Sequence, residues 1–167
     1  MKKIHTFYLL GILLLGLAVM PGNSIAQNKK DSIKTAATTR WINDQDYTFK
    51  AQTTTPLSGR LRQLTTEYSL QVSKDMVISQ LPYFGRAYSA PLNPADAGIQ
   101  FISRDFEYHV NPRKKDGWDI TIKFRDAKDV QLMQLTVFSN GTANLQVISN
   151  SRQSINFGGY VTATDKK

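Results

Sequence analysis

One histidine and two acidic residues lie close together in the sequence and could jointly bind a divalent metal ion. His109 follows Glu107 by two residues and Asp105 by four, and it is the one histidine beyond residue 26. Imidazole and carboxylate groups are ligands that divalent transition metals accept. In an alternating strand, however, these three residues face away from Phe106 and Tyr108 and therefore point to solvent. We predict a solvated strand face here and no metal site.

Other catalytic signatures are scarce. The chain contains no cysteine, which excludes thiol catalysis and cysteine-ligated metal centres. It has no GxSxG nucleophile motif, no P-loop and no dinucleotide fingerprint. A pair of carboxylates for hydrolysis needs only a suitable separation in space, which a sequence does not reveal. We expect a protein that is not an enzyme and has no cofactor, and we keep a carboxylate-dependent hydrolase as an alternative.

The segment best suited to ligand binding is LPYFGRAYSAPLNPADAG, residues 81–98. Its prolines disfavour a central strand, and long loops in compact domains are often functional. Tyr83, Phe84 and Tyr88 could stack on a ligand while Arg86 meets an anion. These four residues are the predicted ligand-binding set. The alternative is an aromatic plug that closes one end of a sheet core.

Apolar and polar residues alternate with a period of two through most of the chain, which is typical of strands with one buried face. The pattern is clearest over residues 46–51, 67–72, 105–110 and 118–125. Several short strands at this spacing predict a mainly β fold, an antiparallel barrel-like or two-layer sheet domain. One short N-terminal helix over residues 32–42 precedes it, with Ile33, Ala36, Ala37 and Trp41 on the buried face and Ser32 as the N-cap.

Two hairpins can be predicted with their register. A three-residue loop, Ser139-Asn140-Gly141, pairs Val137 with Ala143 and keeps apolar residues opposite each other. Its third position favours the left-handed conformation, which suits glycine.

A second hairpin is predicted to pair Val110 with Trp118 and Tyr108 with Ile120. In the final strand, residues 155–163, the consecutive Gly158 and Gly159 indicate a bulge or the close approach of another backbone.

The N-terminus has the three-part layout of a secretory signal peptide. Lys2 and Lys3 precede a charge-free apolar run, and the small residues Ser24 and Ala26 precede Gln27. We expect cleavage before Gln27 and export to the periplasm or medium, with no lipid-anchoring cysteine and no transmembrane segment after removal of the signal. The predicted layout is a signal peptide over 1–26, a flexible leader over 27–31, one β-rich domain over 32–163 and a tail over 164–167.

The charge of the chain is positive but scattered. The 167 residues carry 21 Lys and Arg and 13 Asp and Glu, a net charge of +8, and removal of Lys2 and Lys3 leaves +6. The densest cluster is Arg113-Lys114-Lys115, and no basic stripe or recognition helix accompanies it. We therefore expect no nucleic-acid partner.

Four segments resemble a known bacterial family, the domain-of-unknown-function family 4251. They are LPYFGRAY (81–88), GIQF (98–101), FSNGTANLQV (138–147) and INFGGYV (155–161). The resemblance spans roughly residues 30–163. It implies an exported, single-domain protein of a Gram-negative bacterium, and it implies no activity and no functional residues.

Together these observations predict an exported, non-catalytic binding or interaction module whose partner is a small molecule or a protein. The first alternative is a small barrel that carries a hydrophobic ligand, since barrels of about eight strands can enclose one. An apolar cavity would favour the carrier, and a filled core would argue against it.

Overall fold

The computed structural model describes residues 24–88 and 98–164, with side chains described from Ser32 onward. The chain divides into two units, Met1–Ser32 and Ile33–Lys167, and the second contains the sheet. One helix, α2 (Ser24–Asp44), precedes the strands. The strands are β1 (Tyr47–Pro56), β2 (Arg62–Val72), β3 (Val77–Leu81), β4 (Ile99–Ser103), β5 (Phe106–Pro112), β6 (Trp118–Phe124), β7 (Val130–Val137), β8 (Thr142–Ser149) and β9 (Ile155–Thr162). No helix within the described residues is both long enough and apolar enough to cross a membrane.

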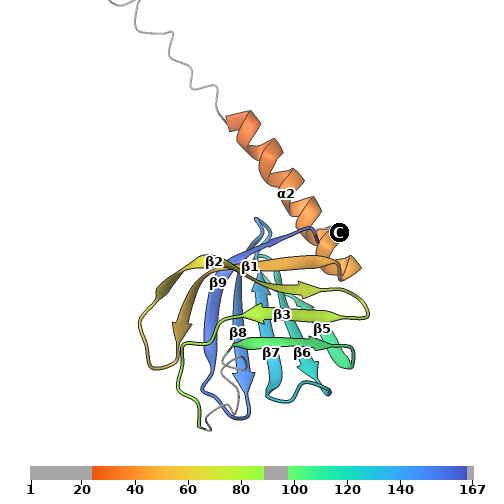
Figure 1. Ribbon diagram of the computed structural model, residues 1–167. Helices are drawn as coiled ribbons and strands as arrows, with labels where there is room; N and C mark the ends of the chain where they lie inside the picture. Colours follow the sequence, from red (N-terminus) through yellow and green to blue (C-terminus); the bar gives the residue numbers. More distant parts are fainter. Residues whose placement is uncertain (1–23, 89–97, 165–167) are drawn as a thin grey trace, which may run out of the picture. The chain divides into compact units, whose positions relative to one another are not determined.

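The strands form one antiparallel sheet that curls into a nearly closed barrel. Their order across the sheet is β4-β3-β2-β1-β9-β8-β7-β6-β5. Figure 1 shows β2 and β3 crossing in front of β8 and β7, so that two parts of the same sheet face each other. This confirms the prediction of a mainly β, antiparallel, barrel-like domain with an N-terminal helix.

The two edge strands, β4 and β5, follow each other in the chain, and the corner between them is held by one carboxylate. Asp126 accepts hydrogen bonds from the backbone amides of Arg104 and Asp105 at 2.8 and 3.1 Å. The hydroxyl of Ser103 also donates to it. Phe101 and Phe124 meet edge to face just inside this corner, with ring centroids 5.0 Å apart. The corner therefore links the two edges although no backbone ladder joins them.

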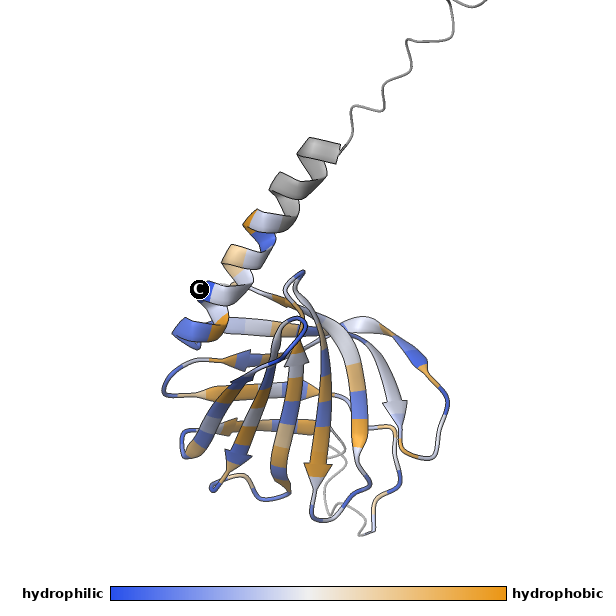
Figure 2. Ribbon diagram, turned by 180° about the vertical axis from the view of Figure 1, so that it is seen from behind, coloured by the Kyte–Doolittle hydropathy of each residue, from blue (hydrophilic) through white to orange (hydrophobic). Residues whose placement is uncertain are grey.

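Large side chains fill the interior of the barrel. Alternate residues of each strand point inward, and Figure 2 shows the resulting alternation of hydrophobic and hydrophilic positions along the strands. The largest fully buried side chains are Tyr47, Phe49, Phe157, Ile42, Leu70, Leu81, Ile120, Ile122, Met133, Leu135, Leu145 and Ile155. A packed core of this kind stabilises the fold through apolar burial.

The hairpin between β7 and β8 has the predicted register. Val137 pairs with Ala143 and Leu135 with Leu145. Gly141 has φ = 87°, the left-handed conformation that the three-residue loop requires. Alternation and turn length were sufficient here because a shift by one residue would have exposed the apolar face.

The predicted register of the hairpin between β5 and β6 is wrong by two residues. Val110 pairs with Ile120 and Tyr108 with Ile122, while Trp118 pairs with Pro112. A shift of two residues keeps every side chain on the same face, so the alternation does not detect it. The ladder instead extends to a short turn in which the amide of Arg113 donates to the carbonyl of Gly117.

The helix differs from its prediction at its start and in its buried face. It begins at Ser24, so residues 27–31, expected as a flexible leader, are helical, and Ser32 lies inside the helix rather than at its N-cap. Ile33 is exposed, whereas Thr38 and Ile42 are buried. Helix-favouring residues N-terminal to the amphipathic stretch, such as Ala26 and Lys29, lengthen the helix. They do not extend its pattern of apolar residues at helical spacing, so the sequence did not reveal the true start of the helix.

Candidate functional site

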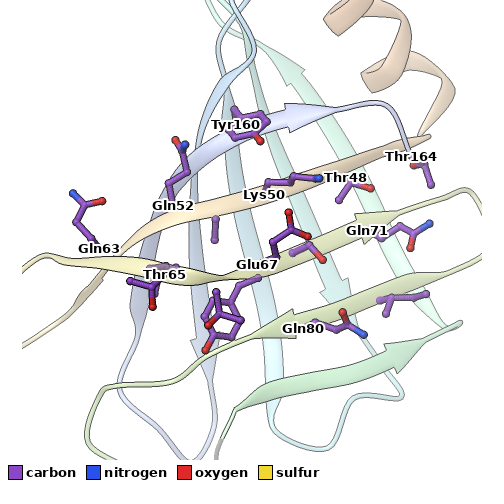
Figure 3. Close-up of a pocket in the computed structure, with 16 residues that line it drawn as sticks. Thr48, Lys50, Gln52, Gln63, Thr65, Glu67, Gln71, Gln80, Tyr160 and Thr164 are labelled. Atoms are coloured by element: carbon purple, nitrogen blue, oxygen red, sulfur yellow. The ribbon is translucent and has the colours of Figure 1, made fainter. Parts of the chain in front are cut away.

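A large hollow lies on the outside of the barrel, over strands β9, β1, β2 and β3. Its volume is about 980 Å³. Figure 3 shows Lys50 of β1, Glu67 of β2 and Tyr160 of β9 gathered around it. The lining residues are Thr48, Lys50, Ala51, Gln52, Gln63, Leu64, Thr65, Thr66, Glu67, Tyr68, Ser69, Gln71, Ile78, Gln80, Tyr160 and Thr164.

A large irregularity between β1 and β2 creates this hollow. Ala51 pairs with Tyr68, but Thr53 already pairs with Gln63, so residues 64–67 of β2 have no partner on β1. On its other side β2 pairs with β3 only over residues 69–72. This unpaired stretch supplies one wall of the hollow, as expected where a bulge bends a strand away from its neighbour.

The same irregularity meets the two consecutive glycines of β9, which confirms the predicted close approach of a backbone. Gly159 pairs with Ala51 and Gly158 with Thr53. A Cβ atom on Gly159 would lie 2.0 Å from the carbonyl oxygen of Lys50. Only glycine therefore allows β9 to pack this closely against β1 beside the hollow.

Most side chains that line the hollow are uncharged hydrogen-bonding groups. Hydroxyls come from threonine, serine and tyrosine and amides from glutamine, while Lys50 and Glu67 are the one cation and one anion. The Oγ1 atom of Thr164 is buried there and has no hydrogen-bond partner within the described residues. Such groups can both donate and accept hydrogen bonds from a polar ligand.

A second, shallower hollow of about 400 Å³ continues the outer face over β1, β9, β8 and β7. Unlike the first hollow, it has no charged residue in its lining, which consists of Thr53, Thr55, Leu61, Gln134, Thr136, Asn144, Leu145, Gln146, Asn156, Phe157 and Gly158. The two hollows adjoin at β1, where Gln52 lines the first and Thr53 the second. Both residues face outward because the bulge places them between the inward-facing Ala51 and Thr54.

None of the four predicted ligand-binding residues of the 81–98 segment lines either hollow, and residues 89–97 lie outside the described part of the chain. Phe84, Arg86 and Tyr88 are exposed, whereas Tyr83 is half-buried and packs against the core. Phe84 lies beside Arg62, whose guanidinium carbon is 5.4 Å from the ring centroid. The structure thus gives these four residues different surroundings, and their role in binding stays a prediction.

Tyr83 is held in place from two sides. Its hydroxyl donates to the carbonyl oxygens of Arg86 and Gln153 at 2.7 and 3.0 Å. The guanidinium of Arg152 lies over the ring, 5.1 Å from its centroid, and forms an ion pair with Asp129 at 2.9 Å. Burial is the largest influence on the pKa of Tyr83 and raises it. These contacts fasten the start of the 81–98 segment to the β8–β9 connection.

The side chains of Asp105, Glu107 and His109 face solvent, as the alternation indicates. Arg125 contacts both acids, and His109 lies 3.7 Å from Glu107. The hydrogen bond and charge of Arg125 lower the pKa of Glu107. Within the described residues, no group of three or more His, Cys, Asp or Glu side chains is arranged to hold a metal ion.

The residues that line the first hollow were missed at the level of sequence because they look like an ordinary solvated strand face. Lys50, Glu67 and Gln71 are the polar partners of buried neighbours in an alternating pattern. The sequence did contain one indication of the hollow, because the consecutive glycines Gly158 and Gly159 predicted an irregular contact with a neighbouring strand. The sequence does not say which strand that is or which side becomes hollow.

The fold defines a small antiparallel β-barrel domain with a packed interior and a hollowed outer face. Residues 29–161 match the family described as Domain of unknown function (DUF4251), and the chain belongs to this family. Its structure is similar to the crystal structure, at 1.95 Å, of a DUF4251 family protein from Bacteroides eggerthii DSM 20697. The TM-score is 0.59 with 10% sequence identity, over 81% of this chain and 91% of that chain. At this identity the likeness shows the fold alone. No match was found among the curated proteins.

Proposed function

We propose that this protein is an exported, non-catalytic binding module that holds its ligand in the hollow on the outer face of the barrel. The observation that carries the proposal is the pairing of a filled interior with an outer hollow of about 980 Å³. Within the described residues, the lining side chains of Lys50, Glu67 and Tyr160 take part in no hydrogen bond or ion pair. Polar groups without partners in a concave surface are available to a ligand.

The composition of the hollow favours binding over hydrolysis. Glycoside hydrolysis usually requires two carboxylates placed on either side of the bond that breaks. Glu67 is the one acidic residue that lines the hollow. The packed interior likewise favours surface binding over the alternative of a carrier that encloses a hydrophobic ligand.

The export part of the proposal rests on the signal-like N-terminus. We expect the full-length chain, expressed in a Gram-negative host, to appear in the periplasm with Gln27 as its first residue. Mass spectrometry of the intact periplasmic protein measures this directly. A product that keeps Met1, or that remains in the cytoplasm, would contradict export.

Ligand mapping by NMR tests the location of the site. The purified, isotope-labelled protein is mixed in turn with small sugars, amino acids and dipeptides, and amide shifts are followed. We expect binding shifts to gather on β1, β2, β3 and β9 around Lys50 and Gln71. Shifts confined to residues 82–88 would instead favour the loop, and the absence of shifts at the hollow with every probe would overturn the proposed site.

A further inference from the structure

We infer that the ligand of this outer hollow is a neutral oligosaccharide that lies along the barrel surface. The inference rests on the proposed function and adds the class of ligand. Its basis is the chemistry of the lining, the balance of charge, one exposed aromatic ring and the continuity of the two hollows.

The lining matches the chemistry of a sugar. A saccharide presents many hydroxyl groups that both donate and accept hydrogen bonds. Glutamine amides from β1, β2 and β3 surround the hollow, as do hydroxyls from Thr48, Ser69 and Thr164. Each of these groups also offers both donors and acceptors. Peptide ligands commonly add a strand to the edge strand of a sheet, and none of the residues that line this hollow lies on the edge strands β4 and β5.

The balance of charge indicates a neutral ligand. The chain as a whole carries a net charge of +8. The lining of the hollow nevertheless contains one cation, Lys50, and one anion, Glu67. A site for an anionic polymer would collect the basic residues that this chain has in excess. Here they lie elsewhere, and the second hollow has no charged residue in its lining.

Tyr160 supplies the aromatic surface that sugar recognition commonly uses. It lies on β9 beside Lys50, its partner in the β1–β9 ladder, and 39% of its surface is exposed. Figure 3 shows its side chain at the rim of the hollow. The C–H face of a sugar ring can stack on an aromatic ring, which buries apolar surface that would otherwise stay in water.

The continuity of the two hollows indicates a chain of sugars rather than one. The bulge turns both Gln52 and Thr53 outward, so that neighbouring residues of β1 line the first and the second hollow on the same outer face. Asn156, Gln146 and Gln134 form a cross-strand row through the second hollow, because Asn156 pairs with Gln146 and Gln146 with Gln134. Gly158 also lines this hollow, next to the row. An extended polymer would meet amide groups along the whole path.

The test measures binding of oligosaccharides to the purified protein by calorimetry. The neutral probes are maltohexaose, cellohexaose, xylohexaose, mannohexaose and chitohexaose. The comparison probes are hexagalacturonate, which is anionic, and a hexapeptide of alternating Gly and Ser. We expect at least one neutral hexasaccharide to bind, and to bind about tenfold more tightly than its disaccharide, since the disaccharide reaches one hollow only.

Variants then assign the contact. Tyr160→Ala should weaken binding about tenfold, because stacking on the ring is lost, while Tyr160→Phe keeps the ring and should change it by about twofold or less. Gln80→Ala, on β3 at the other side of the hollow, should weaken binding about threefold. Because this substitution lies on β3, it tests the site without altering β9. Asn156→Ala should weaken the hexasaccharide and leave the disaccharide unchanged. Ile102→Ala, exposed on β4 outside both hollows, is the matched control.

The possible outcomes separate the two proposals. Binding of a neutral hexasaccharide that depends on Tyr160 and Gln80 supports both. Binding of hexagalacturonate or of the peptide alone, with the same dependence, overturns the neutral sugar and keeps the site. Binding that is unaffected by Tyr160→Ala and by Gln80→Ala overturns the inference and the proposed site together, as does a failure of every probe.

Discussion

The hydroxyl groups of Tyr47 and Tyr108 lie 3.2 Å apart and share a hydrogen bond inside the barrel. Tyr47 belongs to β1 and Tyr108 to β5, an edge strand on the far side of the sheet order. The contact therefore joins two strands that share no backbone ladder. It is one of the few polar contacts within a largely apolar interior. Because both groups are tyrosines, it should make the stability of the barrel sensitive to high pH.

Stability should fall between about pH 10 and pH 12 because of this pair. Burial raises the pKa of Tyr108 to about 12, and it also raises the pKa of Tyr47 well above its ordinary value. Above the ordinary tyrosine pKa of about 10 the unfolded chain loses these protons while the folded chain keeps them. The free energy of unfolding therefore decreases as pH rises through this range, by up to ~1.4 kcal/mol per pH unit for each tyrosine.

Urea unfolding at two pH values measures the effect. One value, about pH 8, lies below the range in which stability should fall, and the other, about pH 11.5, lies within it. Tyr108→Phe should reduce the loss of stability at high pH, and at neutral pH it should cost about 1 kcal/mol because Tyr47 loses its partner. Tyr88→Phe, which alters an exposed ring, is the control and should behave as the native protein does. An equal loss of stability at high pH in Tyr108→Phe and the native protein would contradict the role of the pair.

Replacement of Gly159 by alanine should disrupt the contact between β1 and β9. The new Cβ atom would lie 2.0 Å from the carbonyl oxygen of Lys50, so the two strands would have to separate. We expect a loss of about 3 kcal/mol or more in the free energy of unfolding, measured by urea denaturation. Gly59→Ala is the comparison, since its Cβ atom would meet only the Pro56 ring at 3.1 Å, and it should cost about 1 kcal/mol or less. Similar losses in the two variants would show that the close approach is not a constraint.

Loss of the Arg152 side chain should release the start of the 81–98 segment. Arg152 pairs with Asp129, donates to the carbonyl of Gly98 at 3.0 Å and covers Tyr83, and its side chain is 11% exposed. Arg152→Met should destabilise the protein by about 2–3 kcal/mol, because Asp129 then keeps a partly buried charge without its partner.

The same variant should become sensitive to trypsin after Arg86. In the native protein the carbonyl oxygens of Arg86 and Gln153 both accept from the Tyr83 hydroxyl, which holds this part of the chain in place. Limited proteolysis followed by mass spectrometry detects the cut. Arg40→Met removes an exposed ion pair with Asp44 and serves as the control. If cleavage after Arg86 is equally slow in Arg152→Met and in Arg40→Met, the fastening contact is not what protects the segment.

The corner between β4 and β5 should depend on the charge of Asp126. The hydrogen bond from Ser103, followed by those from the backbone amides, lowers the pKa of Asp126. The carboxylate therefore stabilises the fold at and above its ordinary pKa of about 4, and this contribution disappears as pH falls through the lower, folded value. Asp126→Ala should lower the melting temperature at pH 7 and speed hydrogen exchange at residues 103–106.

The difference in melting temperature between the native protein and Asp126→Ala should shrink in acid (below about pH 3), where the native carboxyl is also neutral. Asp44→Ala, which removes an exposed ion pair with Arg40, is the control and should leave exchange at the corner unchanged. A difference that persists unchanged in acid would mean that the charge of Asp126 does not hold the corner.

Local patterns in the sequence determined seven of the nine strands in the described residues and the register of one hairpin, whereas β3 and β4 were not predicted. Inward alternation is set by the need to bury apolar side chains, and a shift of one residue at Val137 and Ala143 would expose them, so the register of β7 and β8 followed directly. The same reasoning did not separate Trp118 from Ile120 as the partner of Val110, because a shift of two residues costs no burial. The extension of the helix to Ser24 also left no alternating pattern.

Tertiary structure alone decided how the sheet closes and where it is hollow. Tyr47 meets Tyr108, and Asp126 meets the β4–β5 corner, only because the sheet curls until distant strands face each other. The outer hollow arises where β2 leaves β1 between Gln63 and Tyr68, opposite the glycines of β9. Neither strand carries that information by itself, since a bulge becomes the wall of a hollow only through the neighbours that the fold places around it.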